Sequence, residues 1–477
     1  MAPDLYAMGI RARNALWASF FLLGFLGLAW IPRIPEIKTS LGLSDGQFGL
    51  VLLASTVGSI PGAQIAGRAV HSYSSKLVVR ISGVLLPVGV FVVGIAESVQ
   101  VLLLGLFITG FNVAFMDIAI NGQAVEIEKH TKGRWMSSFH GLWSIGAFAA
   151  TLVGGVVANF VSPRGNLIAI SVIGLFAFQF VANLLLPAEH DGHLGEPGKD
   201  DAGKVALFGK ESLILWALGI GLMCSLIPEG GAYEWSGILL QDHMGIGKGL
   251  NAAAATTFSL AMIASRLLGD RAFEKWGHVN TVKYGGYFGG GLWGIGLFVG
   301  MNISDSQPTL GLIIVCLGFG AAGFGMGPFF PAFNLAAASI PGIAPSVGLA
   351  RVGLIAIAAY FGGGLWGIGL FVGINISDSH PTAGLIIVCL GFGAAGFGMG
   401  PFFPAFNLAA ASIPGIAPSV GLARVGLIAI AAYFGGPTII GLIAELTSLP
   451  VAFAFPVVLY MIVGLQSKYI KVRELKQ

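Results

Sequence analysis

The sequence predicts an all-α integral membrane protein made of two six-helix bundles, with an extra helix pair in the second half. Two observations carry this prediction. Hydrophobic residues make up 55% of the 477 positions and charged residues only 10%, whereas soluble domains average about 25% charged residues. The apolar residues also form many runs of about 20, which is the length of a helix that crosses a bilayer. A surface that faces lipid accounts for both.

Residues 1–187 form the predicted N-terminal bundle. Its six apolar windows are 15–31, 48–67, 77–96, 100–121, 136–160 and 166–187. Arg11 and Arg13 precede the first window and no small-residue cleavage site follows it, so we expect an uncleaved first span. Residues 188–212 carry many charges and no apolar periodicity, which predicts a cytoplasmic polar linker between the halves.

Residues 213–477 form the predicted C-terminal bundle. Its eight windows are 213–231, 250–268, 282–301, 309–331, 346–373, 382–404, 419–444 and 449–466. The surplus comes from a tandem repeat, because residues 287–359 recur as 360–432 with only three substitutions. About 14 spans are therefore predicted, and removal of one copy would leave two sets of six.

The distribution of basic residues predicts the orientation. With the N-terminus inside, all but four of the 25 Lys and Arg residues fall on the cytoplasmic side. The four exceptions are Arg33, Lys38, Arg164 and Lys248. Because basic residues are retained on the cytoplasmic side of a membrane, we expect a multi-pass protein of the inner membrane with both termini in the cytoplasm.

Several function classes are disfavoured by what the sequence lacks. It shows no ATP-binding loop, zinc motif or serine nucleophile elbow. Its three cysteines lie in apolar segments without paired spacing, which argues against a metal site or a disulfide framework. We therefore expect no enzyme, no cofactor and no nucleic-acid partner. The expected partners are the lipid bilayer, a small-molecule substrate and protons, with the protein acting as a monomer.

An acid lies within the fourth window. Asp117 is followed at the i+4 position by Asn121, so both project from one helix face. A carboxylate near the bilayer centre costs a few kcal/mol and is by default a functional candidate, here as a reversible proton carrier. The alternative is that Asp117 lies near the cytoplasmic end and pairs with Lys129 or Arg134.

Polar and aromatic residues in the fifth window form a second candidate site. His140, Trp143 and Ser144 share a helix face and offer a titratable ring, a stacking surface and a hydroxyl. Such a set suits a polar ligand. A packing histidine beside an interfacial tryptophan is an equally good interpretation.

Acidic and aromatic residues at the end of the seventh window form a third candidate. Glu229, Tyr233, Glu234 and Trp235 follow or flank a glycine pair, at which we expect the helix to unwind. The cluster either binds or gates a substrate, or forms an aromatic belt with solvated acids. Arg33, between two prolines, either attracts an anionic substrate or pairs with Glu36 or Glu229.

Four short segments carry a family resemblance. They are residues 30–36 (WIPRIPE), 117–121 (DIAIN), 138–144 (SFHGLWS) and 229–235 (EGGAYEW). Together with the two sets of six helices, they resemble the major facilitator superfamily, and within it the YbjJ-like branch related to fucose/proton symporters. The resemblance implies the major facilitator fold, alternating access, a site between the bundles and proton-coupled uptake. It also implies that Asp117 is the coupling acid and that Asn121 belongs to the same motif.

The resemblance further implies two gating loops. One follows the second window, with His71 where the superfamily usually has an acid, and comprises Gly67, Arg68 and Lys76. The other follows the eighth window and comprises Arg266, Gly269, Asp270 and Arg271. Fucose symporters carry an acid in the first span, and none lies between Ala15 and Trp30, which argues against sugar specificity.

The expected function is secondary active transport of a small polar solute across the inner membrane, with proton-coupled uptake. A drug or metabolite exporter is an alternative within the same class. The alternative from another class is a non-transporting sensor or a degenerate paralogue, because the duplication in residues 287–432 alters the second bundle.

Overall fold

A computed structural model describes residues 5–131, 135–191, 213–329, 332 and 436–470. The second copy of the repeat and most of the predicted linker lie outside these residues. The prediction of 14 spans, of the extra helix pair and of the domain boundaries therefore stays a prediction. Within the described residues, eight helices are long and apolar enough to cross a membrane.

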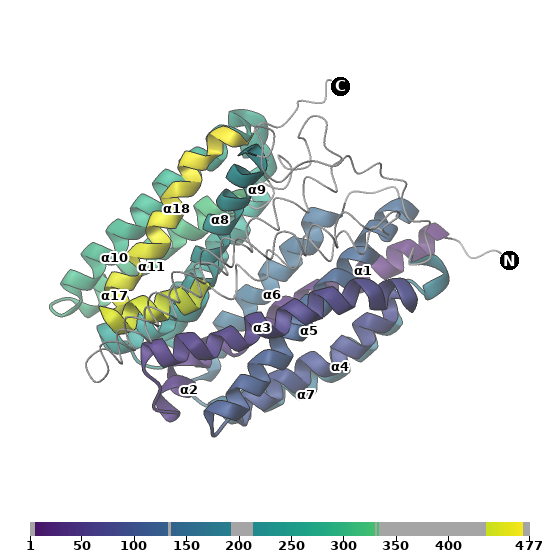
Figure 1. The fold of residues 1–477 in the computed structure, drawn as a ribbon, viewed down its shortest axis with the longest axis horizontal. Helices are drawn as coiled ribbons and strands as arrows, with labels where there is room; N and C mark the ends of the chain where they lie inside the picture. The colour runs from purple at the N-terminus through teal and green to yellow at the C-terminus, as the bar shows by residue number, and fades with distance from the viewer. Residues whose placement is uncertain (1–4, 132–134, 192–212, 330–331, 333–435, 471–477) are drawn as a thin grey trace, which may run out of the picture.

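The first group of helices is coloured purple to blue in Figure 1. Its members pack as antiparallel neighbours joined by short connections, as the apolar windows predict. They are α1 (Leu5–Leu28), η1 (Ile31–Arg33), α2 (Ile34–Ser40), α3 (Asp45–Ser72), α4 (Ser75–Gly94), α5 (Val99–Thr131), α6 (Met136–Val157), α7 (Pro163–Asn183) and η2 (Ala188–His190).

The second group is coloured teal to yellow. Its members are α8 (Leu213–Ile238), the π-helical turn η3 (Leu239–His243), η4 (Leu250–Ala252), α9 (Ala253–Tyr284), η5 (Gly285–Gly289), α10 (Gly290–Ser304), α11 (Pro308–Met326), α17 (Leu449–Ala452), α18 (Ala454–Gln466) and η6 (Ser467–Tyr469). A shorter apolar helix, Gly436–Leu446, belongs to the same group and is called helix 436–446 below.

The helix starts follow from local sequence. Ser44 and Gln47 form a capping box at the start of α3, which satisfies backbone N–H groups that have no partner within the helix. Ser162 accepts a hydrogen bond from the backbone N–H of Gly165 at the start of α7, and Pro163 occupies the first turn. Proline fits there because its missing N–H would have no helical partner anyway. These caps fix where each helix leaves the membrane.

The structure corrects the prediction that the seventh span unwinds at its glycine pair. α8 is helical without a break from Leu213 to Ile238. A Cβ atom at Gly231 would collide with the side chain of Ile440. The glycine therefore permits close approach of helix 436–446, which is the usual role of small residues between membrane helices.

The two groups come together at one end of the molecule. This end, which we call the junction end, carries α2, the start of α3, η3 and η4, and Lys38 of α2 lies 3.0 Å from Asp242 of η3 there. The opposite end, called the terminal end, carries the start of α1 and the end of α18. Successive helices run back and forth between the two ends.

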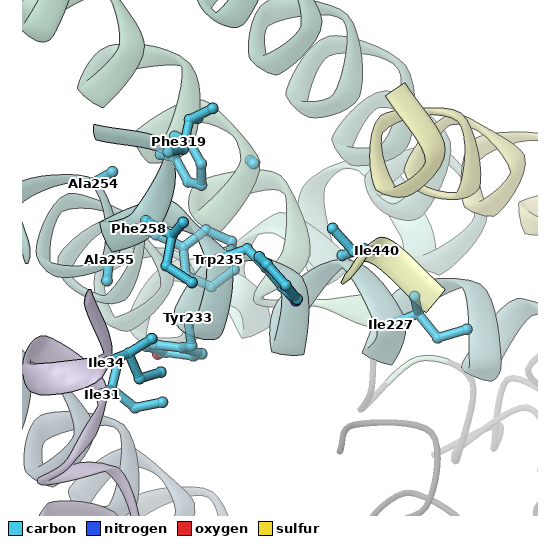
Figure 2. Close-up of a cluster of buried hydrophobic side chains, with 14 of the residues drawn as sticks. Ile31, Ile34, Ile227, Tyr233, Trp235, Ala254, Ala255, Phe258, Phe319 and Ile440 are labelled. Carbon is cyan, nitrogen blue, oxygen red and sulfur yellow. The ribbon is translucent and has the colours of Figure 1, made fainter. Parts of the chain in front are cut away.

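The apolar core continues across the two groups. Ile31 and Ile34 of the first group belong to the same buried cluster as Tyr233, Trp235 and Phe258 of the second group. Figure 2 shows the two isoleucines beside Tyr233. Because membrane helices associate through close van der Waals packing, this shared core holds the halves together at the junction end.

Candidate functional site

An arginine links the two halves near the middle of their helices. Arg266 of α9 donates a hydrogen bond from Nη1 to Oγ of Ser144 on α6. Its Nη2 lies 4.0 Å from Oε1 of Glu229 on α8, and the two side chains are 22% and 7% exposed. Part of the guanidinium therefore remains accessible while its charge is paired, which suits a site that receives a polar ligand.

The hydroxyl of Ser144 can serve two partners at once. Its Oγ lies 3.1 Å from the backbone carbonyl of His140, one turn earlier on α6. A hydroxyl donates one hydrogen and accepts two, so Ser144 donates to this carbonyl and accepts from Arg266. The ring of His140 packs edge-on against Phe20 of α1, with the centroids 5.2 Å apart.

The network continues on α8 and α9. Tyr233 lies one turn after Glu229, and its hydroxyl is 2.9 Å from Oγ of Ser259 on α9. Its ring meets Phe258 edge-on, with the centroids 5.4 Å apart, as Figure 2 shows. Three helices thus hold the central network, defined as His140, Ser144, Glu229, Tyr233, Ser259 and Arg266.

The central network brings together residues that the sequence assigned to separate candidate sites. His140 and Ser144 come from the fifth predicted window, and Glu229 and Tyr233 come from the seventh. Trp143 is half-buried on α6 beside them. Ser259 was missed, because a serine in an apolar window carries no signal without its three-dimensional neighbours.

Arg266 was expected in a gating loop, and the structure corrects its location. Residues 266–271 lie within α9, which runs from Ala253 to Tyr284 with a kink at Gly277. That range includes Gly269, Asp270 and Arg271, while Arg266 faces α6 and α8 through Ser144 and Glu229. An arginine placed at this depth is expected to face the protein interior and a polar partner.

The first predicted gating loop is also mostly helical. Gly67 and Arg68 lie within α3, which continues to Ser72. Lys76 lies in the first turn of α4, where Nζ donates to the backbone carbonyls of Asn183 (2.7 Å) and Leu185 (3.1 Å). A lysine at the C-terminus of a helix satisfies carbonyl groups that lack intrahelical partners, so Lys76 ties α4 to the end of α7.

Asp117 lies on α5, apart from the central network. Nδ2 of Asn121 donates to the backbone carbonyl of Asp117 over 2.8 Å. Among the described residues, no basic side chain forms an ion pair with the Asp117 carboxylate. Asp117 and Asn121 thus share a face of one helix, as expected, and the structure does not bring Asp117 to Glu229 or Arg266.

Arg33 is fully buried and serves as a structural tie. Its Nε lies 2.7 Å from Oε2 of Glu36, and Nη2 donates to the backbone carbonyl of Val161 over 2.8 Å. Of the two alternatives, the structure shows pairing with Glu36. Arg33 therefore holds η1 against the connection between α6 and α7.

Trp235 is also buried between elements. Its Nε1–H donates to the backbone carbonyl of Pro437 over 2.7 Å. Its ring meets Phe48 of α3 edge-on with the centroids 5.7 Å apart. Its full burial argues against the alternative of an aromatic belt, and its contact with Phe48 places Trp235 between the halves.

Ion pairs at the junction end were not found from the sequence. Lys38 of α2 lies 2.8 Å from Asp45 and 3.0 Å from Asp242. Lys248 lies 3.0 Å from Glu36. Both lysines are among the four basic residues that the orientation prediction places on the non-cytoplasmic side. This unusual placement was the sequence signal that could have predicted their ion pairs.

One buried acid at the junction end has no hydrogen-bond partner among the described residues. Glu234 of α8 is 2% exposed, and its Oε2 is buried without a hydrogen bond. The sequence placed Glu234 in a cluster with its neighbours but gave no sign of this isolation. Among the described residues, no group of three or more His, Cys, Asp or Glu side chains is arranged to hold a metal ion.

Two helical groups, eight long apolar helices within the part of the chain that the structure describes, and a charged network between the groups are typical of a multi-pass membrane transporter. The chain belongs to the Major Facilitator Superfamily, whose family model matches residues 16–350. It is thus a transporter of this superfamily with a major facilitator fold.

Relatives support this assignment. The chain is 29% identical over 324 residues to an uncharacterised transporter, y4wD, of Sinorhizobium fredii. This alignment covers 68% of this chain and 81% of that protein. It is 26% identical over 358 residues to an uncharacterised MFS-type transporter of Yersinia pestis, with coverage of 74% and 88%. It is 25% identical over 350 residues to the membrane protein MosC of Rhizobium meliloti, with coverage of 73% and 81%.

Solved structures share the fold. FucP, a Major Facilitator Superfamily transporter in the outward conformation, aligns with a TM-score of 0.55 at 13% identity, covering 97% of this chain and 99% of that chain. A mutant of the nucleoside transporter NupG aligns with a TM-score of 0.58 at 12% identity, with the same coverage.

Proposed function

We propose that the chain moves a small polar solute across the inner membrane by alternating access, as proton-coupled uptake. The observation that carries this proposal is the central network, in which Arg266 of one half bonds Ser144 of the other at mid-helix depth. A transporter needs a site that both halves share, because their relative motion then exposes the site to either side.

The proposed orientation places both termini in the cytoplasm and the junction end outside. The distribution of basic residues supports it, since Arg33, Lys38, Arg164 and Lys248 are the exceptions and all lie near the junction end. With that orientation, the shared core and the ion pairs of Lys38 and Lys248 close the outer side. The described conformation is then one that faces the cytoplasm.

The proposed substrate is held by hydrogen bonds and ring contacts. The guanidinium of Arg266 supplies planar donors, Glu229 accepts, and Trp143 offers a stacking surface. One of the similar solved structures is a nucleoside transporter, so the panel of test substrates should include nucleosides as well as sugars and carboxylates. Asp117 is the proposed coupling acid, since it is an intramembrane carboxylate for which the described residues supply no ion-pair partner.

The test is uptake by proteoliposomes that contain the full chain, with a pH gradient and the panel of solutes. We expect pH-driven uptake that falls at least tenfold in Arg266→Ala, because the variant removes the shared contact and leaves Glu229 buried without its cation. Asp117→Asn should abolish the dependence on the pH gradient while exchange of substrate persists.

The matched control is Arg164→Ala. Arg164 is 63% exposed in its pair with Glu97, and exposed pairs contribute little, so uptake should be unchanged. Solute efflux driven by the same gradient would identify an exporter. Folded protein that moves no solute in either direction would contradict transport and favour a sensor.

A further inference from the structure

Glu234 is a buried carboxylate that the central network does not use. It is 2% exposed, and its Oε2 has no hydrogen-bond partner. It lies five residues after Glu229 on α8, which places the two acids about 140° apart around the helix. Glu229 faces Arg266, so the cation of the central network lies on a different face of α8 from Glu234.

The helical period shows what Glu234 faces. Residues three apart lie on neighbouring parts of one helix face. Gly237, three residues later, faces Pro35 of α2, because a Cβ atom there would lie 3.3 Å from Cγ of Pro35. Gly231, three residues earlier, faces Ile440. Glu234 therefore lies between these two contacts, in the seam where the first group of helices meets helix 436–446; Figure 2 shows Ile440 of that helix near Trp235.

Two hydroxyl groups on the elements that meet at the seam also lack partners among the described residues. Oγ1 of Thr438 on helix 436–446 is one of them: it is buried without a hydrogen bond among the described residues, and the backbone carbonyl of Thr438 lies 3.1 Å from where a Cβ atom at Gly49 of α3 would be. Oγ1 of Thr56, further along α3, is also buried without a hydrogen bond. A seam lined by the unpaired side chains of Glu234 and Thr438 will take up water when it opens.

Charged and titratable groups on the elements around α8 are engaged elsewhere. Among the described residues, no cation lies within ion-pair distance of Glu234. The engaged groups and their partners are Arg33 with Glu36, Lys38 with Asp45 and Asp242, Lys248 with Glu36, Glu445 with the backbone N–H of Gly46, Arg266 with Glu229, Tyr233 with Ser259, and Tyr460 with the backbone carbonyl of Ala322. Lys468 also has a partner, and His243 lies on the exposed turn η3.

Because Glu234 has no partner among the described residues, its protonation state is linked to whether the junction end is closed or open. An ionised carboxylate that is buried without a partner costs several kcal/mol, whereas a neutral carboxyl group costs far less. The closed junction end therefore favours the protonated form. Separation of α2 and α3 from α8 would admit water to the seam, and the carboxylate could then ionise.

We propose that Glu234 is a proton-binding site that controls the junction end: the junction end closes over the protonated carboxyl group and opens when the group ionises. This inference deepens the proposed function, on which it rests, by adding a second proton site in the C-terminal half, separate from Asp117. In the proposed orientation, Glu234 takes its proton from the outer side.

The ion pairs at the junction end predict the opposite response to pH. Protonation of Asp45, Asp242 or Glu36 would break their pairs with Lys38 and Lys248 and open the junction end in acid. Glu234 control predicts that acid closes it. The sign of the pH response therefore separates the two mechanisms.

The experiment measures how fast a membrane-impermeant thiol reagent, added from outside, reacts with a cysteine in the seam. The probe is Leu52→Cys, because Leu52 is 1% exposed and lies one turn from Gly49 on α3. The background is the full chain in proteoliposomes with Cys224, Cys316 and Cys389 replaced by alanine. Rates are divided by those of Phe160→Cys, which is 82% exposed, so that thiol ionisation cancels.

We expect the normalised rate to rise with pH, by up to about tenfold per pH unit through the titration of one group. Adding Glu234→Gln should hold the rate low at every pH, because the neutral amide mimics the protonated acid. The matched control Glu445→Gln removes the carboxylate that accepts from Gly46, and it should raise the rate at every pH while the pH response persists.

A normalised rate that is constant or falls with pH in the parent protein would overturn the proposal, and this result does not depend on how any variant folds. A rise that persists in folded Glu234→Gln would overturn it as well. The labelling needs no substrate, so its outcome is independent of the uptake assay. If the parent protein showed no uptake but its labelling rate still changed with pH in a way that depends on Glu234, the transport proposal would be rejected and the proton-site proposal would be supported.

Discussion

The junction end and the central network join the same two halves in different ways. At the junction end, backbones approach closely, apolar side chains share one core, and ion pairs surround the contact. In the middle, one long arginine side chain spans from α9 to α6 and reaches Glu229 over 4.0 Å. The first contact depends on tight surface complementarity, whereas the second depends on a flexible side chain that can change partners. The halves are therefore expected to separate as a unit at the junction end, while contacts near the centre adjust.

The largest effect is expected where backbones meet. In Gly441→Ala, the new Cβ atom would lie 2.6 Å from the ring of Trp235 and 2.8 Å from both the carbonyl oxygen of Asp45 and Cα of Gly49. Overpacking of this kind costs about 1–3 kcal/mol, which corresponds to roughly 5- to 150-fold in an equilibrium. Labelling of Leu52→Cys under acidic conditions should rise by that factor.

The matched control for this prediction is Gly291→Ala, because a Cβ atom there meets nothing within 4 Å. It should leave the labelling rate unchanged. Equal rates in the two variants would show that the junction end is not closed by close backbone packing.

A smaller effect is expected for Lys38→Ala. Lys38 is 12% exposed and holds Asp45 and Asp242 together, so its loss leaves two acids side by side without their cation. We expect a cost of about 1–2 kcal/mol, above the value of about 0–1 kcal/mol typical of exposed pairs. Seam labelling should therefore increase, and the increase should shrink when salt screens the two acids.

Arg164→Ala is again the exposed counterpart, since Arg164 and Glu97 are 63% and 82% exposed. If it raised the labelling rate as much as Lys38→Ala, the ion pairs between the halves would have no special role in closure.

The smallest effect is expected for Trp235→Phe. The variant keeps an aromatic ring against Phe48 but removes the hydrogen bond to the carbonyl of Pro437. One such bond contributes about 1 kcal/mol, so the melting temperature in detergent should fall by a few degrees. Trp276→Phe, at a ring that is 56% exposed, should not lower it. A fall of the same size in both variants would mean that the bond to Pro437 contributes nothing specific.

The sequence predicted the helical class because hydropathy depends only on local composition. It also identified His140, Ser144, Glu229 and Tyr233, since polar groups are conspicuous in apolar windows. It did not predict that they would form one network with Arg266, because their meeting depends on how α6, α8 and α9 approach each other.

Other predictions failed for a related reason. The glycine pair in α8 indicated an unwound helix, yet the helix continues through it, and Gly231 instead provides the space in which Ile440 packs. Trp235 and Pro437 are 202 residues apart in the sequence, and no local pattern reports such a contact. Glu234 is the clearest example of what a sequence cannot predict. Whether a buried carboxyl group has a partner depends on side chains from every helix that packs around it.

Helix 436–446 is attached to much earlier parts of the chain by direct contacts. Pro437 bonds Trp235, Gly441 meets Gly49, and Glu445 accepts from the backbone N–H of Gly46. Its location is thus specified by what it touches and not by how many residues come before it. The 73-residue repeat ends just before this helix. An insertion at that position lengthens the chain but leaves the contacts of the following helix unchanged. These contacts therefore explain how a packed membrane protein can tolerate a duplication there.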